Sequence, residues 1–104
     1  MSKAGRTPFD TGCTPLVPTA LFTEGSSLVV LTFVDPVTMK STVTGDITMT
    51  PPNTVNGYVE FNPYTWNIYL QNAAAGANTL TYDGISIEDT LTKLPVCGFT
   101  VNDN

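Results

Sequence analysis

Short segments in which apolar and polar residues alternate constrain the fold of this chain more than any other feature. The clearest are Ile47–Thr50, Val55–Phe61 and Trp66–Gln71. Successive side chains of an extended strand point to opposite faces, so a period of two predicts strands with one buried face. Turn residues rich in Pro, Gly and Asn separate the segments at intervals of about 8–12 residues. The pattern predicts an all-β fold, a small antiparallel β-sandwich or barrel of about six to eight short strands.

The alternation also assigns faces to the strands. In Val55–Phe61 the residues Val55, Val59 and Phe61 fall on the apolar side. In Trp66–Gln71 the first residue on the apolar side is Trp66. Three further stretches lie outside the alternating segments. Ser27–Val34 predicts a buried strand, and Val37–Thr44 predicts its hairpin partner after the Asp35-Pro36 turn. Val96–Val101 predicts a last strand.

A hairpin is predicted over Thr79–Glu88. Its centre is Asp83-Gly84, a pair that favours the two-residue type I′ turn because both positions need a positive φ. The implied register pairs Tyr82 with Ile85 and Leu80 with Ile87, which puts these four apolar side chains on one face. Ser86-x-x-Asp89 also resembles a helix N-terminus, so a single helical turn over 88–94 is the alternative for the end of this region.

The first eighteen residues differ from the body that follows. Three prolines and two glycines interrupt them, and their few large apolar residues have no strand or helix period. Fully extended, this stretch would span roughly 55–60 Å at about 3.3 Å per residue. We therefore expect residues 1–18 to form an extended arm, residues 19–101 a β domain, and residues 102–104 a frayed terminus.

Charge limits the class of partner. The chain carries four Lys and Arg against nine Asp and Glu, a net charge of −5 and a pI near 4.1, which argues against binding nucleic acid. Two of the cations, Lys3 and Arg6, lie in the arm, where they either remain solvated or contact an acidic surface of a partner. The chain starts without a signal-peptide pattern and its longest apolar run, Leu28–Leu31, is too short to span a bilayer. We expect no membrane contact and synthesis in the cytoplasm.

Two cysteines, Cys13 and Cys97, lie near opposite ends and match no metal-ligand spacing. A bridge between them would close a loop of about 85 residues and add about 4–5 kcal/mol of stability. Cytosolic synthesis disfavours such a bridge, so we expect two free thiols, with Cys97 in the core and Cys13 on the arm.

Catalytic equipment is sparse. The chain has no histidine, the usual general base and metal ligand. Glu60, Glu88 and Asp89 are the only acidic residues placed for paired-carboxylate chemistry, and adjacent Glu88 and Asp89 would point to opposite faces of a strand. The acidic residues also lack the spacing of a calcium loop. We expect no enzyme activity, no cofactor and no metal site.

Two groups of residues remain as binding candidates. Apolar arm residues and their immediate successors could anchor an interface in which the arm adds to a neighbour's sheet edge. These are Phe9, Leu16, Val17, Leu21 and Phe22. Aromatic residues of the central strands and their turn could form a protein interface or a sugar-stacking platform, or else could fill the core and cover sheet edges. These are Tyr58, Tyr64, Trp66 and Tyr69.

In overall character the chain resembles the small decoration or cement proteins of tailed-phage capsids. Shared features are an N-terminal arm behind Met1, an acidic Thr-rich β body and no catalytic residues. The resemblance implies a structural protein of the virion that is made in the host cytoplasm and docks on a capsid protein, often as a trimer. The alternatives are an Ig-like module that binds carbohydrate or a cell surface, and a small phage inhibitor of a host protein.

Overall fold

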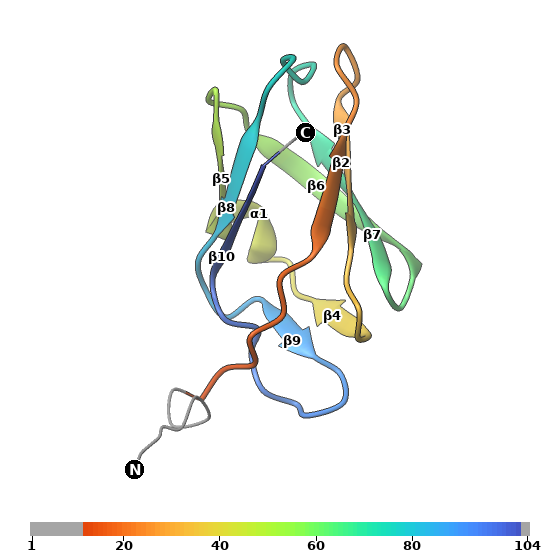
Figure 1. Ribbon diagram of the computed structural model, residues 1–104, viewed down its shortest axis with the longest axis vertical. Helices are drawn as coiled ribbons and strands as arrows, with labels where there is room; N and C mark the ends of the chain where they lie inside the picture. The colour runs from red at the N-terminus through yellow and green to blue at the C-terminus, as the bar shows by residue number, and fades with distance from the viewer. Residues whose placement is uncertain (1–11, 103–104) are drawn as a thin grey trace.

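A computed structural model describes residues 12–102, and in this range the chain is an all-β sandwich, as predicted (Figure 1). One sheet has the strand order β2-β3-β7-β6, with β2 (Thr19–Phe22), β3 (Leu28–Thr32), β7 (Thr65–Leu70) and β6 (Val55–Asn62). The other has the order β10-β8-β5, with β10 (Phe99–Asn102), β8 (Thr79–Tyr82) and β5 (Ile47–Thr50). Every pairing within these sheets is antiparallel.

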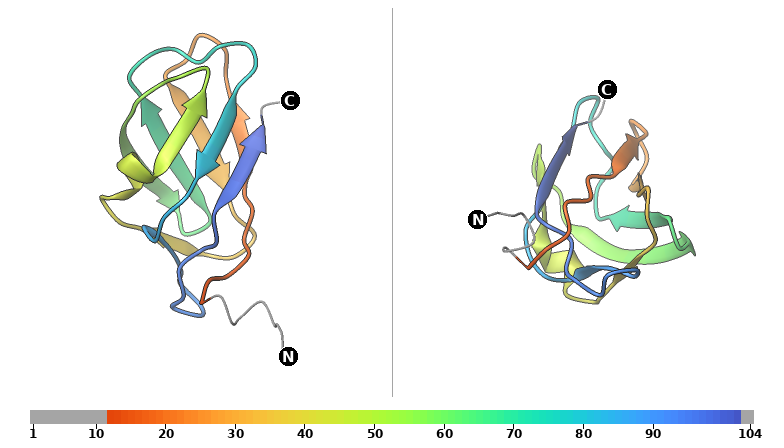
Figure 2. Two further views of the ribbon diagram at one scale, coloured as in Figure 1. Left: turned by 90° about the vertical axis from the view of Figure 1, so that its left-hand side faces the viewer. Right: turned by 60° about the horizontal axis from the view of Figure 1, so that its bottom comes forward.

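The seven strands of the two sheets follow an order known from immunoglobulin domains. Taken along the chain as A to G, they form an A-B-E-D sheet and a C-F-G sheet, the arrangement of a constant-type domain. Two further strands, β4 (Val37–Met39) in the B–C connection and β9 (Ile87–Asp89) in the F–G connection, pair with each other. Figure 2 shows the two sheets facing each other, with this small β4–β9 sheet across one end. That end also holds the β6–β7 turn, and we call it the loop end.

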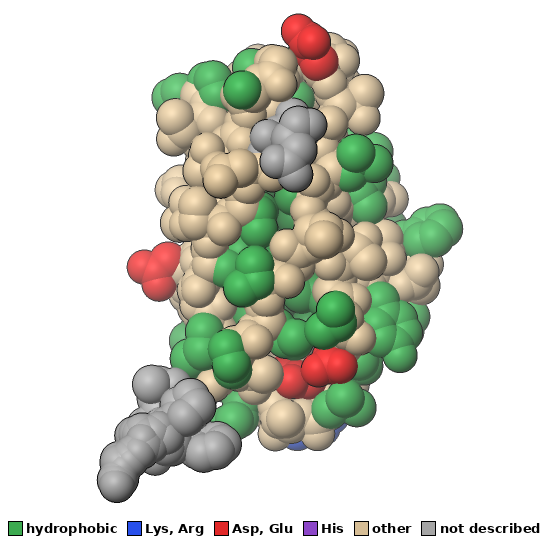
Figure 3. All heavy atoms as spheres, viewed as in Figure 1, with side chains coloured by type: hydrophobic (Ala, Val, Ile, Leu, Met, Phe, Trp, Pro, Cys, Tyr) green, Lys and Arg blue, Asp and Glu red, His purple; other side chains and the backbone are tan. Residues whose placement is uncertain are grey.

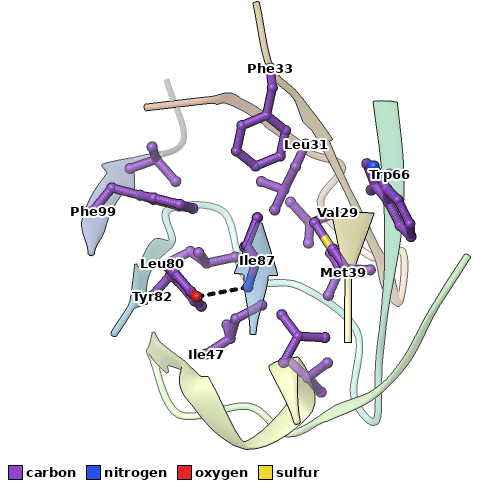
Figure 4. Packing of buried hydrophobic residues seen from close by; sticks show 14 of the residues in the cluster. Val29, Leu31, Phe33, Met39, Ile47, Trp66, Leu80, Tyr82, Ile87 and Phe99 are labelled. Carbon is purple, nitrogen blue, oxygen red and sulfur yellow. Dashed lines mark hydrogen bonds between the residues drawn. The ribbon is translucent and has the colours of Figure 1, made fainter. Parts of the chain in front are cut away.

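The core lies between the sheets (Figure 4). Its centre consists of residues without solvent exposure from both sheets, including Val29, Leu31, Ile68 and Leu80. The alternation predicted for β7 is confirmed, because Trp66, Ile68 and Leu70 are buried while the residues between them are not. β5 follows its predicted pattern as well, with Ile47 and Met49 inside. For both strands, the alternation of apolar and polar residues in the sequence therefore predicts correctly which side chains face the core.

Strand β6 departs from the predicted faces because it contains register shifts. The pairing with β7 moves from Val55 opposite Leu70 to Gly57 opposite Tyr69, so one residue is inserted between these pairs. Such a bulge reverses which residues face the core. Beyond it Tyr58 packs against the core, whereas Val59 and Phe61 are 52% and 72% exposed. The assignment of Val59 and Phe61 to the buried face was wrong.

The hairpin predicted over Thr79–Glu88 does not form. β8 pairs with β5 and β10, while β9 pairs with β4. Neither Asp83 nor Gly84 has the positive φ that a type I′ turn requires. Instead the chain after β8 is held by one long-range and one local hydrogen bond. The Ser86 hydroxyl donates to the Asp46 carboxylate over 2.6 Å, and the Ile87 N–H donates to the Tyr82 hydroxyl over 2.9 Å, the latter drawn in Figure 4.

Val37–Thr44 is also not the hairpin partner of the preceding strand. Only Val37–Met39 is extended, and it pairs with β9. The chain then turns into the one-turn helix α1 (Val43–Asp46), which buries Val43. The alternative of a helical turn over 88–94 is met only in part. This stretch begins inside β9 and continues as an isolated turn, in which the Lys93 N–H donates to the Asp89 carbonyl four residues earlier.

The end of the predicted arm that is described packs against the body. Thr14 forms a parallel bridge with Val96, and Leu16 is 6% exposed within the core. Cys13 and Cys97 form a disulfide with their Cα atoms 5.0 Å apart, which corrects the expectation of two free thiols. That expectation rested on the redox state of the compartment, whereas the Thr14–Val96 bridge places the two cysteines side by side. Residues 1–11 lie outside the described range.

Candidate docking surface

The outer face of the β2-β3-β7-β6 sheet carries an uncharged, mostly apolar row that crosses all four strands. In register across the sheet stand Leu21, Val30, Asn67 and Val59. The row is about 15 Å long, because three strand spacings of about 4.8 Å separate its ends. Leu21 is 63% exposed and Val59 is 52% exposed, so both ends of the row offer apolar surface to solvent.

A second row continues this surface toward the end of the sheet opposite the loop end. It contains Leu28, Tyr69 and Gly57, and the Tyr69 side chain is 41% exposed. None of the residues in the two rows is charged. Interfaces have few charged residues and many tyrosines at their centres, whereas solvated sheet faces are normally polar. We call Leu21, Leu28, Val30, Val59 and Tyr69 the apolar sheet face.

The outer face of the β10-β8-β5 sheet has a different chemistry. Its side chains are five threonines and one asparagine, which stand in two registered rows. Thr81 and Thr100 share a hydroxyl–hydroxyl hydrogen bond of 3.2 Å, and Thr79 donates to Asn102 over 2.8 Å. Figure 3 shows the contrast, with hydrophobic side chains gathered along the flank of the four-stranded sheet. We call this second surface the threonine face (Thr48, Thr50, Thr79, Thr81, Thr100 and Asn102).

Exposed apolar residues also gather at the loop end. Val34 in the β3–β4 connection is 79% exposed, Tyr64 in the β6–β7 turn 46%, and Leu91 after β9 67%. Backbone hydrogen bonds tie these three connections together: the Phe33 N–H donates to the Tyr64 carbonyl, and the Thr90 N–H donates to the Pro36 carbonyl. A surface held in this way loses little conformational entropy when a partner binds.

The structure divides the predicted arm interface. Leu16 and Phe22 are buried in the core, at 6% and 5% exposure, and so do not present their side chains to a partner. Val17 and Leu21 are exposed, and Leu21 belongs to the apolar sheet face. Lys3, Arg6 and Phe9 lie outside the described residues.

The four aromatic residues predicted as a platform do not share one surface. Trp66 is buried, and Tyr58 packs beside it on the inner side of the sheet, with ring centroids 6.0 Å apart. Tyr69 points outward from the same sheet, and Tyr64 lies in the turn at the loop end. Two of the four therefore support the core, and two are accessible at separate places.

The acidic residues considered for catalysis are also dispersed. Asp89 is buried and its carboxylate accepts the Leu91 N–H over 2.9 Å, which is a structural use. Glu88 lies 3.9 Å from the Lys40 ammonium, and Glu60 is exposed on the edge strand β6. Within residues 12–102, no three His, Cys, Asp or Glu side chains gather as a metal site would require.

Comparison of the chain with family models, with curated proteins and with solved structures gave no match. The correspondence with an immunoglobulin domain is therefore one of strand order. No helix in the described range is long and apolar enough to cross a membrane.

Three members of the apolar sheet face were missed by sequence reasoning. Leu28 and Val30 belong to the continuous apolar run of β3, where periodicity does not separate inner from outer residues. Val59 follows the bulge in β6 and was assigned to the core. The sequence held no local signal for Val30, and its outward direction follows from the burial of Val29 and Leu31 on either side of it.

Proposed function

We propose that this is a non-enzymatic structural protein that docks on a larger protein assembly through its apolar sheet face. The single observation that carries the proposal is the uncharged row Leu21–Val30–Asn67–Val59 across an otherwise ordinary sandwich. Apolar patches on the surface of small proteins mark sites of interaction. A flat sheet face suits a broad protein surface better than it suits a small ligand, which usually binds in a concave site.

We further propose that the assembly is a viral capsid, which the protein decorates and stabilises as a component of the virion. If the copies dock as a trimer, each needs only a modest contact, because linked copies bind with a combined affinity greater than that of one copy. The Cys13–Cys97 disulfide supports a final location outside the reducing cytosol, and virion surfaces are among the places where disulfides persist. The carbohydrate-binding alternative has less support, because Tyr58 and Trp66 are directed toward the core.

The proposal is tested by a charge placed on each sheet. Val59→Lys introduces an ammonium group into the apolar sheet face, and Thr48→Lys introduces the same group on the threonine face; both positions lie on edge strands and are exposed. Co-sedimentation with capsids of the encoding virus should show Val59→Lys binding at least 100-fold more weakly, because desolvating an unpaired charge opposes docking. Thr48→Lys should bind within threefold of the wild type.

Equal binding by the two variants would contradict the assignment of the docking face. Absence of wild-type binding to capsids would contradict the choice of partner. Light scattering of the free protein gives its oligomeric state before docking, and an image reconstruction of decorated capsids gives the docked state, for which we expect a trimer. Far-UV circular dichroism confirms that both lysine variants are folded.

A further inference from the structure

The two cationic side chains of the described residues flank one depression at the loop end. Its lining residues are Lys40, Ile85, Glu88, Lys93 and Pro95, and its volume is about 140 Å³. Lys40 follows β4, and the other four come from the long β8–β10 connection that contains β9. Pairing of β4 with β9 brings them together, since the Lys40 N–H donates to the Ser86 carbonyl over 2.8 Å.

Charge at this depression is opposite to that of the rest of the protein. The chain as a whole has a net charge of −5, yet the charged residues that line the depression are two lysines and one glutamate, a formal charge of +1. The Lys40 ammonium lies 3.9 Å from the Glu88 carboxylate, a long and half-exposed pair that contributes little stability. One positive charge is left without compensation, so the depression matches a single monovalent anion. A polyanion such as nucleic acid would be repelled by the net negative charge of the protein.

Backbone geometry fixes Lys93 at this place. Its φ is 66°, and within residues 12–102 it is the one residue other than glycine with a positive φ. The turn that imposes this conformation is closed by two bonds of 2.8 Å, from the Lys93 N–H to the Asp89 carbonyl and from the Asp89 N–H to the Leu94 carbonyl. A lysine is unfavourable in the left-handed region, where glycine or asparagine is usual. Strain of this kind gathers at functional sites.

We infer that this depression receives one carboxylate of a partner protein, from an acidic side chain that lies beside an aliphatic group. The two ammonium groups take the carboxylate, and the aliphatic neighbour contacts Ile85, which is 71% exposed, and Pro95. The inference rests on the proposed function for the identity of the partner, a capsid protein. It adds a polar contact at the loop end, which would fix the orientation of the sandwich on the capsid.

The test uses 3-methylbutanoate as a probe, a carboxylate with a short branched tail, and 3-methylbutanamide as its uncharged control. Each is titrated at constant ionic strength into the ¹⁵N-labelled intact protein. We expect saturable amide shifts at Ile85, Glu88 and Lys93 with a dissociation constant in the millimolar range, and no saturable shifts with the amide. Glu88→Gln should tighten binding of the carboxylate about threefold, because it removes the competing charge.

Lys93→Gly separates binding from folding. Glycine relieves the left-handed conformation, so this variant should melt about 2–5 °C higher than the wild type while its affinity for 3-methylbutanoate falls at least fivefold. Shifts that fail to saturate by 100 mM, that appear equally with the amide, or that persist unchanged in Lys93→Gly would each overturn the inference. Concentration-dependent self-association that Lys93→Gly abolishes would overturn the choice of partner, since the carboxylate would then come from a second copy.

This outcome is independent of the docking test. The titration contains no capsids, and Val59→Lys, on a different surface, should bind the probe as the wild type does. A failed titration with intact capsid binding would remove only the carboxylate site. A successful titration without capsid binding would remove the proposed function, and with it the capsid protein as the source of the carboxylate, while the carboxylate site itself would stand.

Discussion

The two outer faces of the sandwich have the same strand geometry and differ in the polarity of their exposed side chains. Both belong to antiparallel sheets, both present registered rows of side chains, and neither row set contains a charge. On the threonine face, hydroxyl groups bond to their neighbours, as in the Thr81–Thr100 pair, and remain compatible with water. On the apolar sheet face, Leu21 and Val59 expose hydrocarbon instead.

This difference separates what the fold needs from what a partner needs. Either face would serve equally well to cover the core, because the inward residues of each strand supply the burial. Exposed leucine and valine contribute nothing comparable to folding, and contiguous apolar surface is a liability for solubility unless a partner covers it. The comparison therefore points to the apolar sheet face as the docking surface, and the threonine face becomes its internal control.

The largest effect we expect comes from the covalent link between the two sheets. Cys13 precedes β2 of one sheet and Cys97 precedes β10 of the other, so the disulfide joins them. Replacing both with serine should lower the free energy of unfolding by about 4–5 kcal/mol, because the unfolded chain regains the freedom of an 84-residue separation. Urea denaturation of the variant and of reduced wild-type protein measures the loss.

The two preparations should agree within about 1 kcal/mol if the disulfide is responsible. A loss below about 1 kcal/mol would mean that the Thr14–Val96 bridge and Leu16 hold the segment without it. For protein that remains folded, capsid binding should be unchanged, because the apolar sheet face contains neither cysteine. Weakened binding by folded, reduced protein would show that docking depends on how the sheets are joined.

The second prediction converts one face into the other. Leu21→Thr combined with Val59→Thr gives the apolar sheet face the chemistry of the threonine face. We expect capsid affinity to fall about 30-fold, because docking would bury exposed hydrocarbon at both positions, and losing it costs about 1 kcal/mol at each. The free energy of unfolding should change by less than about 0.5 kcal/mol, since both side chains are exposed.

Isothermal titration with capsids and urea denaturation give the two quantities. A large loss of stability with little loss of binding would invert our assignment and make these residues part of the fold. Leu28 and Tyr69 stay unchanged in this variant, so residual binding reports what the second row contributes.

The sequence predicts which side chains of a strand face the core where the strand is regular. The prediction fails where pairing with another part of the chain changes the register. Burial alternates along β5 and β7 as expected, because successive side chains of these regular strands point to opposite faces of the sheet. The bulge after Val55 depends on how β6 registers against β7, which no local pattern records. Asp83-Gly84 has the composition of a tight turn. The residues after it instead form hydrogen bonds, from Ser86 to Asp46 and from Ile87 to Tyr82, and the chain continues into a different sheet.

The same reasoning applies to the candidate sites. Leu21 and Tyr69 were predicted interface residues, and the structure places both on one outer face through their common pairing with β3. Lys40 and Lys93 line one depression because β4 pairs with β9, a long-range pairing without a local signal. The disulfide was judged by compartment rather than by topology, and topology decides which cysteines are neighbours.

The smallest effect is expected on the threonine face itself. Thr81→Val with Thr100→Val removes the 3.2 Å hydroxyl pair from the centre of that face and replaces it with two side chains of high β propensity. An exposed hydrogen bond contributes little net stability, so the free energy of unfolding should stay within about 0.5 kcal/mol of the wild type. Capsid affinity should remain within twofold of the wild type, because the variant leaves the apolar sheet face unchanged and the new valines lie on the opposite sheet. If this variant instead gains affinity for capsids, the partner recognises apolar β-surface wherever it occurs. Position on the sandwich would then not be what distinguishes the two faces.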